Sequence, residues 1–114
     1  SKQLCGKPIG RTLWRLEEIE GHWDDLVMRA HAVIDGERVL YQEGRLSALR
    51  PPSDLLARRP GGPSLPPGWA MFGGTLGAIG GIRPATRFEM ELEDPVLGRV
   101  MRHAYDVVEL PVVA

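Results

Sequence analysis

Thr75 and the glycines around it are the residues best placed to do chemistry in this chain. They lie in the run WAMFGGTLGAIGGIRP at positions 69–84, which contains Gly73, Gly74, Gly77, Gly80 and Gly81. Glycine adopts φ > 0 easily and lets a second molecule approach backbone N–H groups, so such loops often hold oxyanions or carboxylates. A hydroxyl here can bond a ligand carboxylate together with those N–H groups. A tight turn capped by threonine is the alternative interpretation.

Two lysines, Lys2 and Lys7, lie beside the only cysteine, Cys5, at the start of the chain. A lysine ammonium can stabilise a developing oxyanion, although the sequence alone favours a frayed, solvated terminus. No neighbour in the sequence marks the Cys5 thiol as activated, so an inert thiol is expected. A single cysteine cannot form an intrachain disulfide, which favours a reducing compartment and predicts a cytoplasmic location.

Several standard catalytic motifs are absent from the sequence. The glycine run lacks the Lys-Ser or Lys-Thr of a P-loop and the spacing of a dinucleotide fingerprint, and H-E-x-x-H, C-x-x-C and G-x-S-x-G do not occur. The three histidines are far apart in the sequence and show no metal-ligand spacing: His22, His31 and His103. Glu89, Glu91 and Glu93 alternate with apolar residues. An outward polar strand face therefore explains them better than a metal site does.

The composition is typical of a soluble globular domain. The 114 residues are 43% apolar and 25% charged, and the formal net charge is −1. This length fits a single domain, 1–114. The charge balance indicates no nucleic-acid partner, and no apolar stretch is long enough to span a membrane.

The elements that must position the glycine loop are mostly strands. Residues 26–34 and 37–42 alternate around Asp35-Gly36, which predicts a hairpin with a type I′ turn. Further strands are expected at 69–73, 86–92 and 99–110, a helix at 53–59 with Ser53 as N-cap, and a surface loop at 60–68. Gly44 is expected to break the second hairpin strand. The predicted class is mainly β, with five or six strands in mixed or antiparallel pairing and two short helices.

Several motifs in order carry a family resemblance. They are Ser1-Lys2, Asp35-Gly36-Glu37, Leu40-Tyr41-Gln42-Glu43-Gly44, Pro67-Gly68 and Gly74-Thr75-Leu76-Gly77-Ala78-Ile79-Gly80. Their order resembles the C-terminal part of the fumarylacetoacetate hydrolase superfamily, in a bacterial branch of it. Leu76 stands where that family usually has proline, and Ser1-Lys2-Gln3 departs from its commoner Gly-Lys-Ser.

The resemblance implies a mixed β-sandwich or roll with one or two short helices, usually dimeric. Such enzymes use Mg²⁺ or a similar divalent ion to act on a 2-oxo acid or acylpyruvate by C–C hydrolysis, decarboxylation or hydration. By resemblance, Lys2 and Thr75 are catalytic, and Gly74, Thr75 and Gly77 bind the acidic substrate. The family's metal carboxylates precede the lysine motif, so no metal ligand is assigned in 1–114. The chain is then expected to be the C-terminal half of a longer catalytic domain, to contact the missing half, and to be inactive alone.

Two interpretations from other classes stay open. The second hypothesis is a non-catalytic β-domain that binds an acidic ligand or a protein partner through the glycine loop. A structural domain that dimerises through exposed strand edges is the third possibility.

Overall fold

The computed structural model describes residues 2–113, and of Lys2 only the backbone. Its elements are η1 (Lys2–Leu4), α1 (Leu16–Ile19), η2 (Glu20–Asp25), β1 (Val27–Ile34), β2 (Glu37–Arg45), η3 (Leu46–Ala48), α2 (Pro52–Ala57), β3 (Arg87–Asp94) and β4 (Arg99–Asp106). The three η elements are single or kinked 3-10 turns. Within this part of the chain no helix has the length and apolar character that crossing a bilayer requires.

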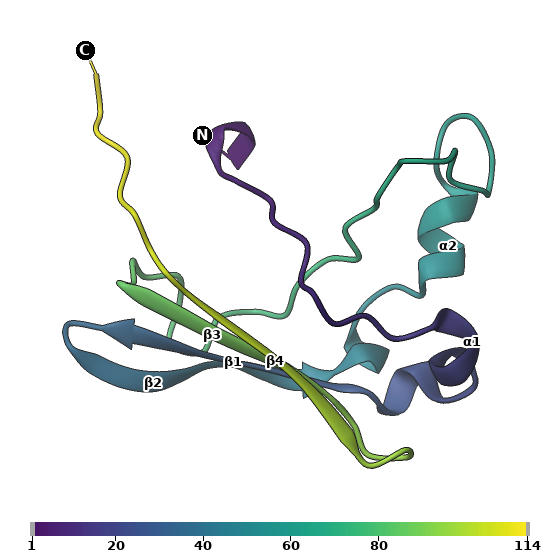
Figure 1. Ribbon diagram of the computed structural model, residues 1–114, viewed down its shortest axis with the longest axis horizontal. Helices are drawn as coiled ribbons and strands as arrows, with labels where there is room; N and C mark the ends of the chain where they lie inside the picture. Colours follow the sequence, from purple (N-terminus) through teal and green to yellow (C-terminus); the bar gives the residue numbers. More distant parts are fainter. Residues whose placement is uncertain (1, 114) are drawn as a thin grey trace.

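The strands form one antiparallel sheet in the order β2-β1-β3-β4 (Figure 1). This confirms the mainly β class with two short α-helices, with four strands in the described residues where five or six were expected. One sheet face carries Ala30, Ala32, Phe88 and Met90, and the opposite face carries the charged residues of the same strands. The first is called the apolar face below and the second the charged face.

The β1–β2 hairpin has the predicted turn. Asp35 and Gly36 have φ of 51° and 79°, the pair of positive values that defines a type I′ turn. The closing pair is Ile34 and Glu37. The turn twists in the same sense as the strands, which is why an Asp-Gly pair fits here.

A β-bulge in β2 redirects two side chains. Ala30 pairs with Gln42 and His31 pairs with Leu40, so Tyr41 is the extra residue. In a regular strand Tyr41 and Gln42 would point to opposite faces, but a bulge turns the strand locally. Tyr41 therefore meets Phe88 on the apolar face, with ring centroids 6.2 Å apart, and Gln42 lies on that face as well. The predicted break at Gly44 is wrong, because Gly44 lies within β2.

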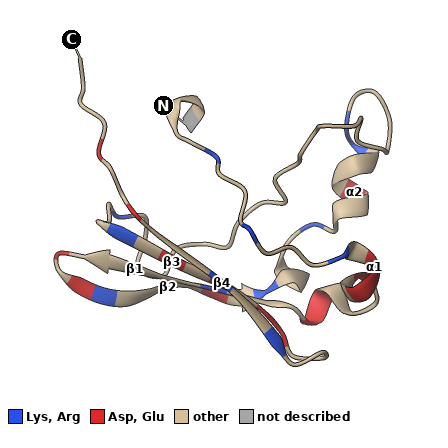
Figure 2. Ribbon diagram, viewed as in Figure 1, with Lys and Arg blue, Asp and Glu red and all other residues tan. Residues whose placement is uncertain are grey.

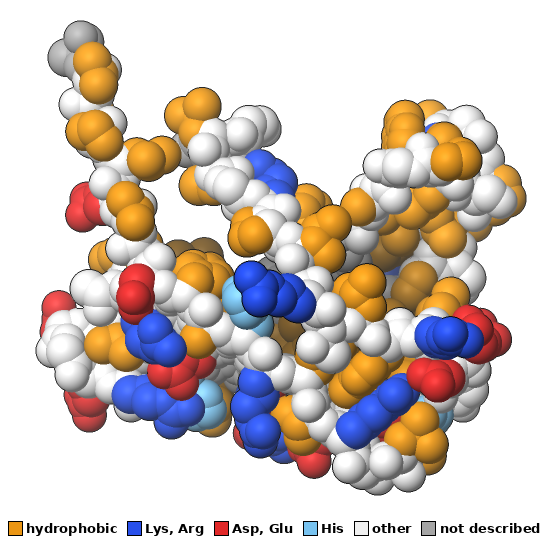
Figure 3. All heavy atoms as spheres, in the orientation of Figure 1, with side chains coloured by type: hydrophobic (Ala, Val, Ile, Leu, Met, Phe, Trp, Pro, Cys, Tyr) orange, Lys and Arg blue, Asp and Glu red, His pale blue; other side chains and the backbone are white. Residues whose placement is uncertain are grey.

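The hydrophobic core is small and sits at one end of the sheet. Leu26 is fully buried, and Ile19 and Leu46 complete the cluster where η2 and η3 meet. The radius of gyration is 16.0 Å, whereas a compact domain of this length has about 13 Å. Apolar side chains cover the extended terminal arms and the α2 lobe in Figure 3, and Ile9, Leu13 and Val108 are more than two-thirds exposed. The described chain therefore leaves much apolar surface without internal cover.

Three predicted elements differ from the structure. Residues 69–73 are not a strand, because no sheet strand pairs with them, and Trp69 and Phe72 are 61% and 79% exposed. The predicted strand 99–110 ends at Asp106. Helix α2 begins at Pro52 with Pro51 as its N-cap, so Ser53 lies inside the helix. The loop at 60–68 is confirmed.

Candidate functional site

The glycine loop docks on the outer edge of β2 through hydrogen bonds. The Gln42 Nε2 amide donates to Thr75 Oγ1 at 2.8 Å and also to the carbonyl oxygen of Leu76. The backbone N–H of Ile79 donates to the Tyr41 carbonyl at 2.8 Å. Both anchors on β2 belong to the bulge, so the bulge is what brings the loop and the strand together.

Glycines give the loop its path. Gly74, Gly80 and Gly81 have φ of 97°, 79° and 87°, a region that residues with a side chain rarely adopt. On the strand, a Cβ at Gly44 would lie 3.1 Å from Leu76 Cδ1. The missing side chain at position 44 therefore makes room for Leu76, the residue next to Thr75.

Arg83 and Tyr41 fix the far end of the loop. The Arg83 guanidinium donates from Nη2 to the Ile79 carbonyl at 2.8 Å, and its carbon lies 5.8 Å from the centre of the Tyr41 ring. The backbone N–H of Arg83 donates to the Tyr41 hydroxyl oxygen at 3.2 Å. These contacts hold an arginine near the loop while its side chain remains partly open to solvent.

The structure brings some predicted site residues together and leaves one outside. Gly74, Thr75 and Gly77 are exposed on the loop, and Thr75 contacts Gln42. The Lys2 side chain lies outside the described residues, so its predicted position facing Thr75 stays a prediction. Cys5 is exposed, and its carbonyl oxygen accepts a hydrogen bond from Lys7 Nζ at 2.9 Å.

Sequence reasoning missed Gln42 and Arg83 as site residues. Alternation along β2 gives no sign of a bulge at Tyr41, so nothing predicts that Gln42 would face the loop. The only sequence signal was the Leu40–Gly44 segment itself, which belongs to the family resemblance. Arg83 follows the last glycine of the loop, but its interactions depend on the loop's path.

The arrangement suits binding of an anion by neutral hydrogen-bond donors. The Thr75 hydroxyl proton goes to the Leu76 carbonyl over a long 3.4 Å contact, which a ligand oxygen can replace. An exposed glycine loop also offers backbone N–H groups to the same ligand. The side chains of Gln42 and Thr75 do not titrate near neutral pH, so they position a ligand and do not transfer protons.

The charged face is covered by a ladder of ion pairs. Arg29 contacts Glu43 and Glu93 at 2.8 Å and Glu91 at 3.2 Å, while Glu89 lies between Arg38 at 2.9 Å and Arg87 at 3.2 Å. Figure 2 shows the acidic and basic positions distributed along the strands of the sheet.

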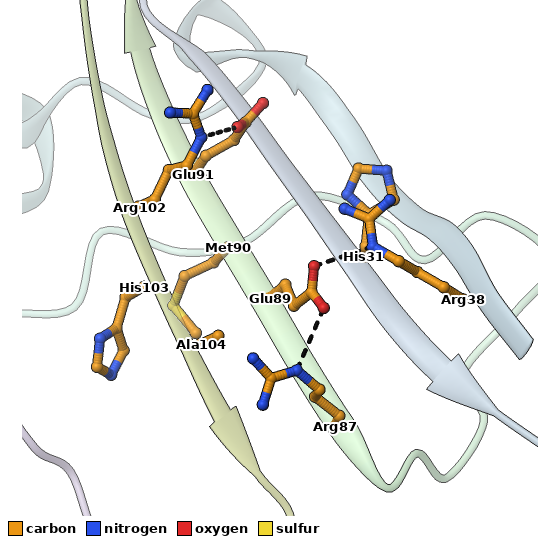
Figure 4. A pocket seen from close by; sticks show the side chains of 9 residues that line it. All are labelled: His31, Arg38, Arg87, Glu89, Met90, Glu91, Arg102, His103 and Ala104. Atoms are coloured by element: carbon orange, nitrogen blue, oxygen red, sulfur yellow. Dashed lines mark hydrogen bonds and ion pairs between the residues drawn. The ribbon is translucent and has the colours of Figure 1, made fainter. Parts of the chain in front are cut away.

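A shallow cavity of about 380 Å³ opens over this ladder. Figure 4 shows Glu89 between Arg38 and Arg87, which line the cavity with it. Hydrogen bonds from Arg38 and then Arg87 hold the pKa of Glu89 below its ordinary value. Burial raises the pKa of Glu91, but the donors Arg29 and Arg102 outweigh it and the net pKa is lowered. The acids that resemble a metal triplet are therefore already bonded to arginines. Among residues 2–113 no three His, Cys, Asp or Glu side chains gather as a metal ion would require.

Asp94 forms a second polar cluster, which joins η2 to the β3–β4 turn. Its buried carboxylate accepts from His22 Nε2 at 2.9 Å and from the backbone N–H groups of Val96 and Leu97 at 3.1 Å. Burial raises the pKa of Asp94, but the Leu97 N–H and His22 outweigh that effect and lower it overall. Arg99 Nε lies 3.4 Å from the other carboxylate oxygen. Every one of these contacts is internal, so the cluster acts as a structural link.

Comparison with known proteins identifies a family. A protein-family model described as "Protein of unknown function (DUF2848)" matches residues 1–105. No curated protein and no solved structure matches the chain.

Proposed function

This chain belongs to the DUF2848 family, and we propose that it forms the substrate-holding part of a divalent-metal-dependent enzyme that acts on 2-oxo acid or acylpyruvate-like substrates. The reaction is C–C hydrolysis, decarboxylation or hydration. The proposal includes the fumarylacetoacetate hydrolase type of C-terminal fold and a cytoplasmic location. It rests on the resemblance of the glycine loop and hairpin motifs together with the geometry of the loop.

The observation that carries the proposal is the contact between Gln42 and Thr75. It joins the hairpin motif to the Gly-Thr motif, which is separate in the sequence: the half-buried Gln42 amide donates to Thr75 Oγ1 and to the Leu76 carbonyl and so holds the exposed Thr75 hydroxyl in place. A planar carboxylate has two oxygens that accept several hydrogen bonds, so the Thr75 hydroxyl and neighbouring backbone N–H groups suit it. In the proposed site Thr75, with the N–H groups near Gly74 and Gly77, holds the substrate carboxylate.

Lys2 completes the substrate side of the proposed site. A lysine ammonium is a compact charge that stabilises an oxygen as negative charge develops on it. The divalent ion, Mg²⁺ or a similar one, would polarise the 2-oxo group when bound. Its carboxylate ligands are proposed to come from a segment that precedes the lysine motif, as in the family that the chain resembles.

The exposed apolar surface of this chain favours the proposal that a second polypeptide segment packs on it. The radius of gyration is 16.0 Å, the core is limited to a few side chains around Leu26, and apolar residues of the arms and of the run 69–84 are exposed, such as Ile9, Leu13 and Phe72. Exposed apolar surface of this extent is typical of interfaces. We therefore propose that the metal-binding segment packs on these exposed apolar residues and that 1–114 alone does not turn over substrate.

Oxalate, a stable dianion that mimics a 2-oxo acid, tests the proposal. Calorimetry of the protein carrying its upstream segment is expected to show oxalate binding that requires Mg²⁺ and is lost in Thr75→Val. Acylpyruvate turnover should need the same segment. Mg²⁺-dependent turnover by residues 1–114 alone contradicts the claim that they are inactive, and unchanged oxalate binding in Thr75→Val removes the loop from the site.

The exposed aromatic residues beside the loop favour one alternative. Trp69 and Phe72 are 61% and 79% exposed, as expected for a β-domain that binds an acidic ligand or a protein partner without catalysis. In that case ligand binding at the loop is independent of Mg²⁺, and Trp69→Ala weakens it more than Thr75→Val does.

A further inference from the structure

Strand β4 leaves one edge of the sheet open. The sheet order places β4 at the end, next to β3 alone. The backbone N–H of Val107 donates to Thr86 on the β3 side at 2.8 Å. Because hydrogen-bonding direction alternates along an antiparallel strand, the backbone groups of Val100, Arg102, Ala104 and Asp106 point away from β3. Within residues 2–113 no other segment pairs with that edge.

The tail after β4 continues the open edge. Figure 1 shows the chain running on from β4 beyond the sheet to its C-terminus. Val107, Val108 and Val112 in this tail are 44%, 81% and 99% exposed. An edge strand followed by an extended apolar segment is a template for pairing with another chain.

The sequence of this edge is complementary to itself when reversed. Residues 99–109 read RVMRHAYDVVE. If two copies pair antiparallel about a two-fold axis at Ala104, each residue faces the one equally far on the other side of position 104. The facing pairs are then Ala104–Ala104, His103–Tyr105, Arg102–Asp106, Met101–Val107, Val100–Val108 and Arg99–Glu109. Apolar residues meet apolar residues, and every charged residue meets one of opposite sign.

Neighbouring registers lose this match. A two-fold axis at Arg102 places that arginine opposite its own copy, and like charges directly opposite are unfavourable. An axis at His103 places Arg102 opposite Ala104 and Asp106 opposite Val100. If the two-fold axis lies between two residues, backbone groups that point away from β3 in one copy lie opposite groups that point toward β3 in the other. The two strands then cannot form a ladder of hydrogen bonds.

Arg102 and Asp106, the oppositely charged pair of this register, lie on the charged face and already take part in its ion pairs. Arg102 Nε contacts Glu91 at 3.1 Å and Arg87 contacts Asp106 at 3.1 Å. The side chains of Arg102 and Asp106 are still 72% and 79% exposed, so each has room for a second partner. In a paired dimer these two residues extend the ion-pair ladder from one sheet into the next.

We propose that β4 and residues 107–109 form a homodimer interface, in which a second copy pairs antiparallel about Ala104 and the two sheets join into one. A two-fold axis makes the interface self-complementary, so one patch serves both copies. The small side chain of Ala104 suits the axis, where identical residues face each other. This inference does not depend on the proposed function, because it concerns the edge far from the β2 loop in the strand order.

A mixing experiment tests the register. In a dimer of Arg102→Asp, the aspartate at position 102 of each copy faces Asp106 of the other copy, so two acids meet. In a dimer of Asp106→Arg, the arginine at position 106 of each copy faces Arg102 of the other copy, so two bases meet. Each variant is expected to weaken dimerisation roughly tenfold in sedimentation experiments, because two symmetric pairs change sign. Mixed together, the two variants restore both opposite-charge pairs and should form a heterodimer. Each variant alone is the control for effects within one chain, including the Glu91 and Arg87 contacts.

A cysteine cross-link gives an independent readout in a Cys5→Ser background. Facing residues in a hydrogen-bonded antiparallel pair have Cα atoms about 5.5 Å apart, which a disulfide can span. Ala104→Cys should therefore give a disulfide-linked dimer under mild oxidation. The matched control Val100→Cys lies on the same edge but faces Val108, so it should stay unlinked. A monomer at all concentrations overturns the proposal, and so do equal cross-linking of both variants or failure of the mixture to associate.

Discussion

Gln42 and Thr75 are in direct contact although they are 33 residues apart in the sequence: the amide Nε2 donates to the hydroxyl oxygen at 2.8 Å. The contact exists because the bulge at Tyr41 turns Gln42 toward the loop. The position of the glycine loop therefore depends on an irregularity in a neighbouring strand. Changes at either residue should affect ligand binding more than the stability of the sheet.

Removing the Gln42 amide should loosen the loop. A neutral hydrogen bond contributes about 1 kcal/mol, so Gln42→Ala should weaken oxalate binding by about fivefold when the proposed metal-binding segment is present. The melting temperature should stay nearly constant, because Thr75 is exposed and the core lies elsewhere. Calorimetry with Thr75→Ser as the control, which keeps the hydroxyl, measures this. Equal weakening by Thr75→Ser and Gln42→Ala contradicts the assigned role of the hydroxyl.

A side chain at Gly44 should displace Leu76. The Cβ of a residue at this position would lie 3.1 Å from Leu76 Cδ1, so Gly44→Val overpacks the strand–loop contact. We expect a loss of about 1 kcal/mol in urea unfolding. Leu76→Ala in the same chain removes the atoms that clash, so the double variant should be more stable than the two single effects predict by addition. Strict additivity contradicts the contact.

The sequence predicted local structure well and long-range structure poorly. The Asp35-Gly36 turn and the alternation of 86–92 depend on near neighbours, and both are present. The segment 69–73 has the composition of a strand but lacks a partner, and alternation cannot show that. The predicted strand 99–110 ends at Asp106 for a similar reason: after Val107, whose N–H donates to Thr86, no described residue of the tail pairs with the sheet.

The candidate site was predicted in part. Glycine content identified the loop, since φ values such as 97° at Gly74 are hard for other residues. Its partner Gln42 was not predicted, because the bulge depends on how β1 and β2 align and on the loop that docks there. The Asp94–His22 link, between residues 72 positions apart, has no local sequence signal at all.

Substitution of Gly36 in the type I′ turn should lower the free energy of unfolding, whereas a matched substitution of Asp35 should not. Gly36 has φ of 79°, so Gly36→Ala should destabilise the chain by about 1 kcal/mol through left-handed strain. Asp35 has φ of 51°, which asparagine also adopts readily, so Asp35→Asn is the matched control with little effect. Urea unfolding measures both. If Gly36→Ala is as stable as Asp35→Asn, the turn geometry is different from that described here.

Asp94 should make the stability of the chain depend on acid pH. Its folded pKa is lowered, after burial, by the Leu97 N–H and His22, from an ordinary value of 3.8. Below that ordinary value the unfolded chain binds a proton that the folded chain does not, so stability falls as the pH falls. The contribution is fully present above about pH 4 and is lost as the pH drops through the folded pKa. Asp94→Asn should therefore be less stable at pH 7, with a deficit that shrinks in acid.

A matched variant isolates this contribution from other acids with lowered pKa, such as Glu89 and Glu91. Asp24→Asn removes an exposed carboxylate outside the β4 edge, so it should change stability little at any pH. Thermal unfolding from pH 2 to pH 7, a range that extends below the ordinary pKa, compares both variants with the parent chain. A constant deficit for Asp94→Asn across this range would show that the carboxylate acts through packing and not through its charge.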